Sequence, residues 1–190
     1  MRRLNADGTT ATVLLLQEDC YWVANVGDSR AVLVKRNGRT VQLSCDHRVG
    51  NFREEDNVQQ RGGQILRAGT RDNASAHDRV NGGSGLTRCI GSSKLKPILS
   101  AVPDILHRRF EDDDLYVVLA TNGMWDDVSN TEVGETMLAG PPCHPTRVTP
   151  CHAPHPPYIG LLFAPCSPRT CCAEAYSTLR ITLQAELSHF

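Results

Sequence analysis

Short apolar segments separated by tight turns are the feature that most constrains the fold of this 190-residue chain. Four such segments, rich in β-branched and apolar residues, cover 9–17, 21–26, 31–35 and 40–43. The turn before the last segment holds the pair Asn37-Gly38, which is a strong signal of a β-hairpin because both residues tolerate a positive φ. The sequence therefore predicts an antiparallel meander in this region.

Helices are expected to lie outside these strands. Residues 52–61 are rich in Glu, Gln and Arg, have Phe52 and Val58 as apolar anchors, and end at two glycines, which predicts a solvent-facing helix. The apolar run 115–120 predicts a buried strand. After it, Ser129-Asn130 can cap a last helix that carries Glu132 in its first turn.

The composition changes sharply after Gly140. Nine of the eleven prolines, five of the eight cysteines and four of the seven histidines follow it, but only five of the 41 charged residues do. We therefore divide the chain into a domain at 1–140 and a Pro/Cys/His-rich tail at 141–190.

The tail is expected to be disordered. Its prolines are too closely spaced for a helix or a central strand, and its cysteines and histidines lack the spacing of structural zinc sites. One alternative stays open, since Tyr176, Leu179, Leu183 and Leu187 have a spacing that permits a short amphipathic helix at the end.

Charge and hydropathy exclude several classes of partner. A net charge of −1 favours neither nucleic acid nor an anionic membrane as a partner. No stretch approaches the roughly 20 apolar residues of a spanning helix, and no apolar segment of a secretory signal follows the first residues. We expect an intracellular protein, cytoplasmic or nuclear.

Several motifs, in this order, resemble the type 2C family of metal-dependent protein serine/threonine phosphatases. They are GTTA (8–11), VANVGDSRAVL (23–33, similar to the family's central hairpin), LSCDHR (43–48), EEDNVQQRGGQI (54–65), DRVNGGSGLTRCIGSSKLKP (78–97) and EDDDLYVVLATNGMWDDVSNTEV (111–133). The resemblance covers about residues 8–138. It implies an α+β fold, an antiparallel β-sandwich flanked by helices, here in incomplete form.

The resemblance also implies a metal site that this sequence does not complete. The family hydrolyses phosphoserine and phosphothreonine with two Mg²⁺ or Mn²⁺ ions held by carboxylates. Its Asp-Gly-His-Gly-Gly loop and a Glu-Asp pair belong before Gly8, where this sequence has only seven residues, and its final Asp-Asn segment has no counterpart. Ser92 and Asn122 stand where the family has aspartates. Asp28 is retained, at a position that is peripheral in the family, near a weaker third ion.

Plainer interpretations stand beside these assignments. Asp28 and Arg30 could simply close a tight turn, and His47 is a turn residue or a neighbour of the site rather than a general acid. The acidic run 112–114 suggests a cation site, although before a strand such a run is usually a solvated turn.

We therefore expect no catalytic residues and no cofactor for this chain. The leading hypothesis is a pseudophosphatase or truncated fragment that acts by binding a phosphoprotein, a kinase or an active phosphatase. The alternative is an active Mg²⁺- or Mn²⁺-dependent serine/threonine phosphatase. A third is a chain without a stable fold, because part of the sandwich is missing.

Overall fold

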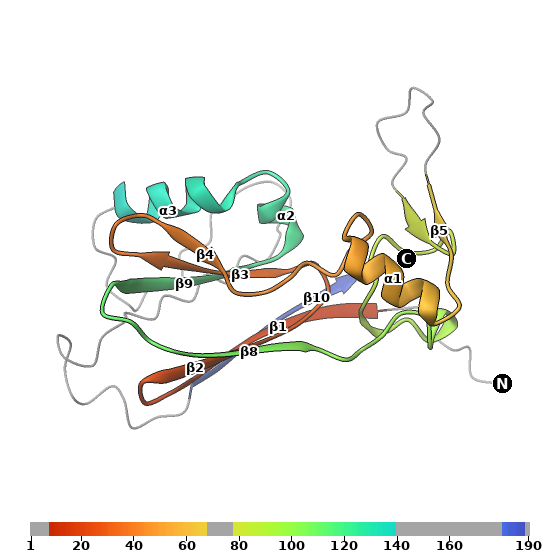
Figure 1. Cartoon of the computed structure of the whole chain (residues 1–190), viewed down its shortest axis with the longest axis horizontal. Helices are drawn as coiled ribbons and strands as arrows, with labels where there is room; N and C mark the ends of the chain where they lie inside the picture. The colour runs from red at the N-terminus through yellow and green to blue at the C-terminus, as the bar shows by residue number, and fades with distance from the viewer. Residues whose placement is uncertain (1–7, 68–77, 140–179, 189–190) are drawn as a thin grey trace.

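Two antiparallel sheets lie face to face in the computed structural model, which describes residues 8–67, 78–139 and 180–188 (Figure 1). The first sheet has the strand order β10-β1-β2-β8, and the short β7 pairs with the start of β1. Its strands are β1 (Gly8–Gln17), β2 (Cys20–Val26), β7 (Ile90–Gly91), β8 (Asp104–Arg109) and β10 (Arg180–Ser188).

The second sheet has the order β4-β3-β9 and is buried on both faces. Its strands are β3 (Arg30–Lys35), β4 (Thr40–Gln42) and β9 (Asp114–Ala120). The helices α2 (Asn122–Trp125) and α3 (Asn130–Ala139) cover its outer face, with Trp125 and Val133 packed on β3 and β9 (Figure 1). Burial on both faces explains why β3 and β9 are nearly continuous apolar runs instead of alternating ones.

The core lies between the two sheets. The first sheet contributes Leu14, Tyr21 and Val23, and the second contributes Leu33 and Leu119, all of them buried. In β1 and β2 the burial alternates from residue to residue, because only one face of the first sheet packs on this core.

A third group of elements lies beside one end of the sandwich (Figure 1). It contains α1 (Phe52–Gln60), the two-stranded pair β5 (Ile65–Leu66) and β6 (Arg79–Val80), and the 3₁₀ helix η1 (Ser93–Leu95). Its apolar cluster is built around Val58, Val80 and Leu99. This group carries the loops that reach the candidate site.

The predicted α+β sandwich is confirmed, but one pairing within it is wrong. The hairpins β1–β2 and β3–β4 form as expected, the second through Gly38 at φ +85°. The segments on either side of Gly27 do not pair, because β2 belongs to the first sheet and β3 to the second. The chain passes from the first sheet to the second at Gly27, which has φ +110° and lies so close to Thr10 that an added Cβ would be 2.2 Å from Thr10 Cγ2.

The helix α1 also differs from its predicted orientation. Phe52, expected to be an anchor, is 81% exposed, whereas Glu54 and Glu55 are buried. Glu54 and Val58 are four residues apart and therefore share one helical face, and that face packs inward. The helix accordingly buries the Glu54 carboxylate, which forms an ion pair with Arg88.

The helix α3 begins as predicted. Ser129 and Glu132 form a reciprocal capping box, in which the Glu132 carboxylate accepts from the Ser129 N–H at 2.8 Å and Ser129 Oγ accepts from the Glu132 N–H at 3.2 Å. None of the described helices is long and apolar enough to cross a membrane.

The last strand departs from the expectation of a disordered or helical tail. Residues 180–188 form β10, which pairs antiparallel with β1 from Gly8↔Ser188 to Leu16↔Arg180. The predicted helical spacing included Leu183 and Leu187, but the backbone there is extended. The rest of the predicted tail, 141–179 and 189–190, lies outside the described residues, so the division at residue 140 and the disorder expected there stay predictions.

Candidate functional site

The three predicted metal-ligand positions lie at one end of the sandwich, as the strand register shows. Asp28 is in the turn between β2 and β3, and Asn122 follows β9, whose last residue Ala120 pairs with Arg30. Ser92 follows Gly91, which pairs with Gly8 at the start of β1. We call this region, made of Gly8, 27–29, Ser92 and 120–122, the Asp28 end.

The Asp28 end contains two buried hydroxyl groups with no hydrogen-bond partner among the described residues, Ser92 Oγ and Thr121 Oγ1. Ser92 has a left-handed backbone, with φ 49° and ψ 51°. A neutral hydroxyl is a poor ligand for a hard divalent cation, which prefers carboxylate oxygens. These two hydroxyl groups are therefore poorly suited to bind a divalent metal ion, and among the described residues they have no hydrogen-bond partner.

The described residues of the Asp28 end do not fit a two-metal centre. Two adjacent divalent ions need several anionic oxygens, and of the three positions only Asp28 carries a charge. Within the described part of the chain, the one place where three His, Cys, Asp or Glu ligand atoms gather is elsewhere, at Glu111, Asp113 and Asp114.

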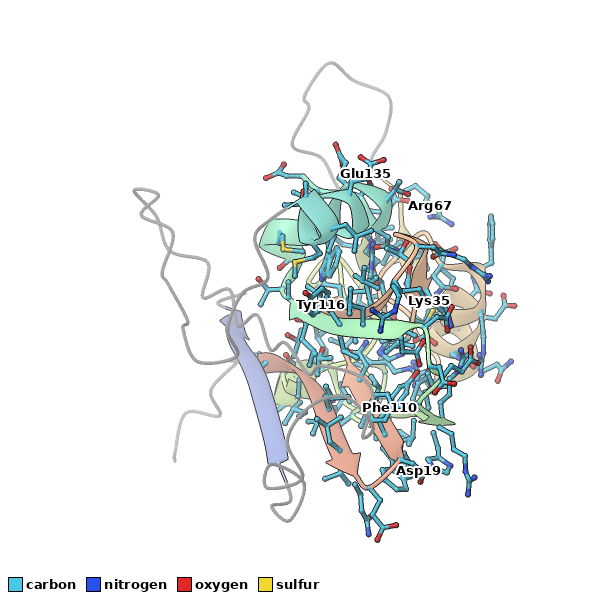
Figure 2. The ribbon with its side chains drawn as sticks, turned by 90° about the vertical axis from the view of Figure 1, so that its left-hand side faces the viewer. Asp19, Lys35, Arg67, Phe110, Tyr116 and Glu135 are labelled. Atoms are coloured by element: carbon cyan, nitrogen blue, oxygen red, sulfur yellow. The ribbon has the colours of Figure 1, made fainter. Side chains whose placement is uncertain are left out.

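That acidic group surrounds Lys35, the last residue of β3, and Figure 2 labels this lysine. Lys35 Nζ lies 2.8 Å from Glu111, 2.8 Å from Asp113 and 3.0 Å from Asp114. The hydrogen bonds that Lys35 Nζ donates to Asp113 and Glu111 raise the pKa of Lys35, so its ammonium stays charged. The expectation of a solvated turn holds for Asp112 and Asp113, which lie in a turn and are exposed or half-buried, but not for Asp114, which is the buried first residue of β9.

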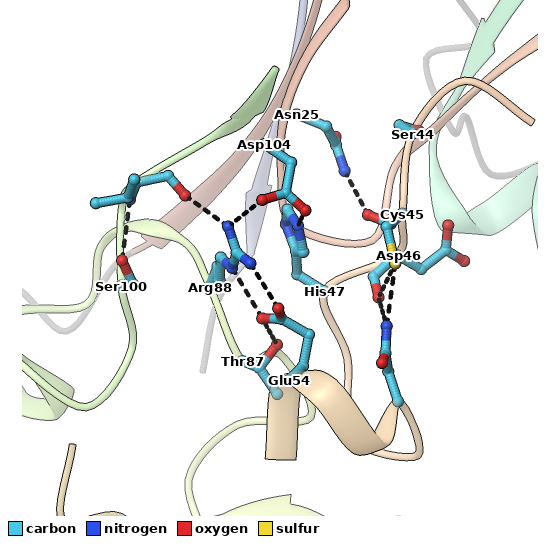
Figure 3. A network of polar contacts seen from close by, with 12 residues as sticks. Asn25, Ser44, Cys45, Asp46, His47, Glu54, Thr87, Arg88, Ser100 and Asp104 are labelled. Atoms are coloured by element: carbon cyan, nitrogen blue, oxygen red, sulfur yellow. Dashed lines mark hydrogen bonds and ion pairs between the residues drawn. The ribbon is translucent and has the colours of Figure 1, made fainter. Parts of the chain in front are cut away.

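Beside the Asp28 end, a buried ion pair connects α1 to the loop before β7 (Figure 3). Arg88 donates two hydrogen bonds to Glu54, at 2.6 and 2.8 Å, and a third to Asp104 at 2.8 Å. Thr87 Oγ1 donates to the same Glu54 carboxylate at 3.0 Å. Burial is the largest influence on the pKa of Glu54 and would raise it, but the hydrogen bonds and charge of Arg88, together with His47 and Thr87, outweigh burial and hold that pKa below its usual value.

His47 extends this network to the turn that carries Asp28. Its buried ring accepts the Gly27 N–H at Nδ1, 3.1 Å away, and its Nε2 lies 3.1 Å from Asp104. Burial is the main reason that the pKa of His47 lies below its usual value, and the Asp104 hydrogen bond only partly opposes it. His47, expected to be a turn residue or a neighbour of the site, lies between β4 and α1 and contacts the turn that carries Asp28. Its burial and its partners were not foreseen.

Arg30 does not act only as a turn residue. Its guanidinium donates to both carboxylate oxygens of Asp46, at 3.0 and 2.6 Å, and to Asn130 at 2.8 Å. It also lies over the Trp125 ring, 5.2 Å from its centroid. Arg30 thereby joins the loop after β4 to the helices α2 and α3.

Sequence reasoning missed the buried ion pair as a whole. Glu54, Arg88 and Asp104 belong to segments far apart in the chain, and no short motif joins them. One signal was present, since Glu54 shares the helical face of Val58, which is the buried face of α1.

The fold by itself defines a class, the α+β proteins in which two antiparallel sheets pack face to face. The family model described as "Protein phosphatase 2C" matches residues 2–139. The chain belongs to the protein phosphatase 2C family.

Curated relatives are longer than this chain. It is 39% identical over 134 residues to "Protein phosphatase 2C 3" of Arabidopsis thaliana, which covers 70% of this chain and 28% of that protein. It is 40% identical over 134 residues to "Probable protein phosphatase 2C 68" of Oryza sativa, covering 69% of this chain and 35% of that protein. The chain thus spans about a third of the length of these relatives.

Solved structures show the same fold. A Caenorhabditis elegans protein described as a sex determining protein matches with a TM-score of 0.57 and 26% identity, over 64% of this chain and 28% of that one. The serine-threonine phosphatase 2C of Toxoplasma gondii matches with a TM-score of 0.57 and 23% identity, over 68% of this chain and 46% of that one. The second likeness concerns the fold alone.

Proposed function

We propose that this chain is a part of a protein phosphatase 2C domain that has lost phosphatase activity and acts by binding other proteins. The observation that carries the proposal is the Asp28 end, where Ser92 and Asn122 replace two anionic ligands and leave Asp28 as the one carboxylate among the three positions. The role is intracellular, cytoplasmic or nuclear, in keeping with the composition.

The size of the lost charge supports this proposal. A pair of unit charges 4 Å apart is worth about 4 kcal/mol at an effective dielectric of about 20. One such pair corresponds to roughly three orders of magnitude in metal affinity. Two neutral replacements therefore weaken the binding of Mg²⁺ or Mn²⁺ far below what a binuclear centre requires.

The test compares the 190-residue chain with a variant in which both carboxylates are restored, Ser92→Asp/Asn122→Asp. We expect the native chain to release no phosphate from p-nitrophenyl phosphate or a phosphothreonine peptide in Mn²⁺, and calorimetry to show weak Mn²⁺ binding. The restored variant should bind Mn²⁺ more tightly.

A matched control adds two charges away from the Asp28 end, at exposed Gln17 and Gln60 (Gln17→Glu/Gln60→Glu). This variant should bind Mn²⁺ like the native chain. Hydrolysis by the native chain that a chelator abolishes contradicts the proposal. A restored variant that binds no better than the control contradicts it as well.

The binding role predicts one of three partner classes, a phosphoprotein, a kinase or an active phosphatase. Fluorescence anisotropy with a phosphothreonine peptide and its unphosphorylated counterpart tests the first. Kinase and 2C phosphatase assays with the chain added test the others, through a change in their rates. No effect in any of the three assays refutes the binding role.

The rival function is metal-dependent hydrolysis of phosphoserine or phosphothreonine. Membership of the family supports it, and so do the relatives named as phosphatases. The chelator-sensitive assay above decides between the two.

A further inference from the structure

The turn that carries Asp28 is held by buried side chains at both backbone groups of Gly27. The Gly27 N–H donates to His47 Nδ1 at 3.1 Å, and the Gly27 carbonyl accepts from Asn25 Nδ2 at 3.1 Å and from the His47 N–H at 2.9 Å. Asn25 is itself fixed by Thr12, whose hydroxyl donates to Asn25 Oδ1 at 2.6 Å. The turn therefore has little freedom of its own.

The hydrogen bond from Gly27 determines the protonation of the His47 ring. An amide N–H can donate only to a lone pair, so Nδ1 carries no hydrogen and the ring hydrogen of the neutral form lies on Nε2. There it points to the Asp104 carboxylate of β8, 3.1 Å away (Figure 3).

The charged groups that surround His47 come from three parts of the chain. Asp104 belongs to β8, Arg88 to the loop before β7, and Glu54 to α1. Arg88 joins the two carboxylates by hydrogen bonds to both. Hydrogen bonds thus connect Glu54 of α1, through Arg88 and Asp104, to the His47 ring.

We propose that His47 is a positioning residue: its neutral ring, oriented by Asp104, fixes the turn 27–29 through the Gly27 N–H and so determines where the Asp28 carboxylate lies. The inference does not depend on the proposed function, because it concerns the turn whether the chain binds or hydrolyses. A doubly protonated ring would present an N–H to the Gly27 N–H, and the hydrogen bond would be lost.

Two substitutions separate the two nitrogens. His47→Asn places a carbonyl oxygen near the position of Nδ1 and can still accept the Gly27 N–H. His47→Gln reaches toward Asp104 in place of Nε2 but leaves the Gly27 N–H without an acceptor. The pair is matched, since both side chains are amides and both remove the ring.

The readout is amide hydrogen exchange of the full chain, followed by NMR and normalised to Val117 in the core. Because one buried hydrogen bond is lost, we expect the Gly27 amide to exchange about tenfold faster in His47→Gln. In His47→Asn its exchange should stay within about twofold of the native rate. A purely structural role would accelerate Gly27 and Val117 together.

A second measurement needs no variant and covers the case in which the variants fail to fold. The ¹⁵N shifts of the His47 ring in the native chain should show the hydrogen on Nε2. A hydrogen on Nδ1 overturns the proposal. Equal acceleration of Gly27 in the two variants, or acceleration in neither, overturns it too.

Discussion

Removing the positive partner of a buried carboxylate should destabilise this protein more than most single substitutions. Glu54 is 1% exposed and Arg88 is 6% exposed, and two hydrogen bonds of 2.6 and 2.8 Å join them. In Arg88→Met, Glu54 keeps the Thr87 hydroxyl at 3.0 Å but loses the guanidinium that is hydrogen-bonded to it. A single buried charge left in this way costs about 3–5 kcal/mol.

This cost is large beside the whole stability of a domain, which is typically about 5–15 kcal/mol. Glu54→Leu/Arg88→Met removes both charges and replaces them with apolar groups, so it should recover most of the loss. The remaining partner of Arg88, Asp104, is about one-third exposed (35%) and can be solvated by water.

Urea denaturation followed by tryptophan fluorescence measures these differences, since Trp22 and Trp125 report on the two sheets. We expect a lower midpoint for Arg88→Met and partial recovery in the double variant. A loss below about 1 kcal/mol for Arg88→Met would refute the reasoning. So would a double variant whose loss equals the sum of the losses measured for Arg88→Met and for the single variant Glu54→Leu.

Two further predictions concern the turn and its histidine. Gly27→Ala should lower the free energy of unfolding by about 2 kcal/mol or more, because φ is +110° and the new Cβ would lie 2.2 Å from Thr10 Cγ2. The matched control is Gly50→Ala, at φ +102° with open space around it, which should cost less in the same urea experiment. The free energy of unfolding should fall on acidification, because burial lowers the pKa of His47 in the native state. The stability that the neutral His47 ring contributes is fully present above the ordinary pKa of 6.5 and is lost as the pH falls through the native pKa. Urea titrations at about pH 7.5 and 5.5 measure the free energy of unfolding, and a value that does not fall between these two pH values contradicts the prediction. The pKa of Asp104 is also lowered in the native state, which extends the loss of stability to lower pH.

Much of the fold could be predicted from local patterns. The apolar run at 115–120 forms most of β9, the Asn37-Gly38 pair closes the β3–β4 hairpin, and Ser129 caps α3 with Glu132. These features depend on residues that are neighbours in the chain, so turn chemistry and periodicity are sufficient.

The errors arose where contacts distant in sequence decide the outcome. The chain leaves the first sheet at Gly27, where the backbone lies against Thr10 of β1, and no local pattern contains that contact. Similarly, α1 looked solvent-facing because its composition is polar, although Arg88, 34 residues after Glu54, makes the burial of that carboxylate tolerable.

The candidate site shows the same division. Asp28, Ser92 and Asn122 were predicted from motif positions, and the strand register brings them to one end of the sandwich. The hydrogen bonds that Gly27 makes with the side chains of His47 and Asn25 were not foreseen, because these two residues come from segments that have no pattern in common.

The strand β10 alters the environment of β1 along nearly its whole length. With β2 and β7 on one side and β10 on the other, β1 has hydrogen-bonding partners along both of its edges. If β10 were removed, the N–H and C=O groups from Gly8 to Leu16 that face it would become a template for strands of other molecules. Removing β10 from the C-terminal end of the chain would therefore favour aggregation, even though β10 lies beyond the region that matches the family.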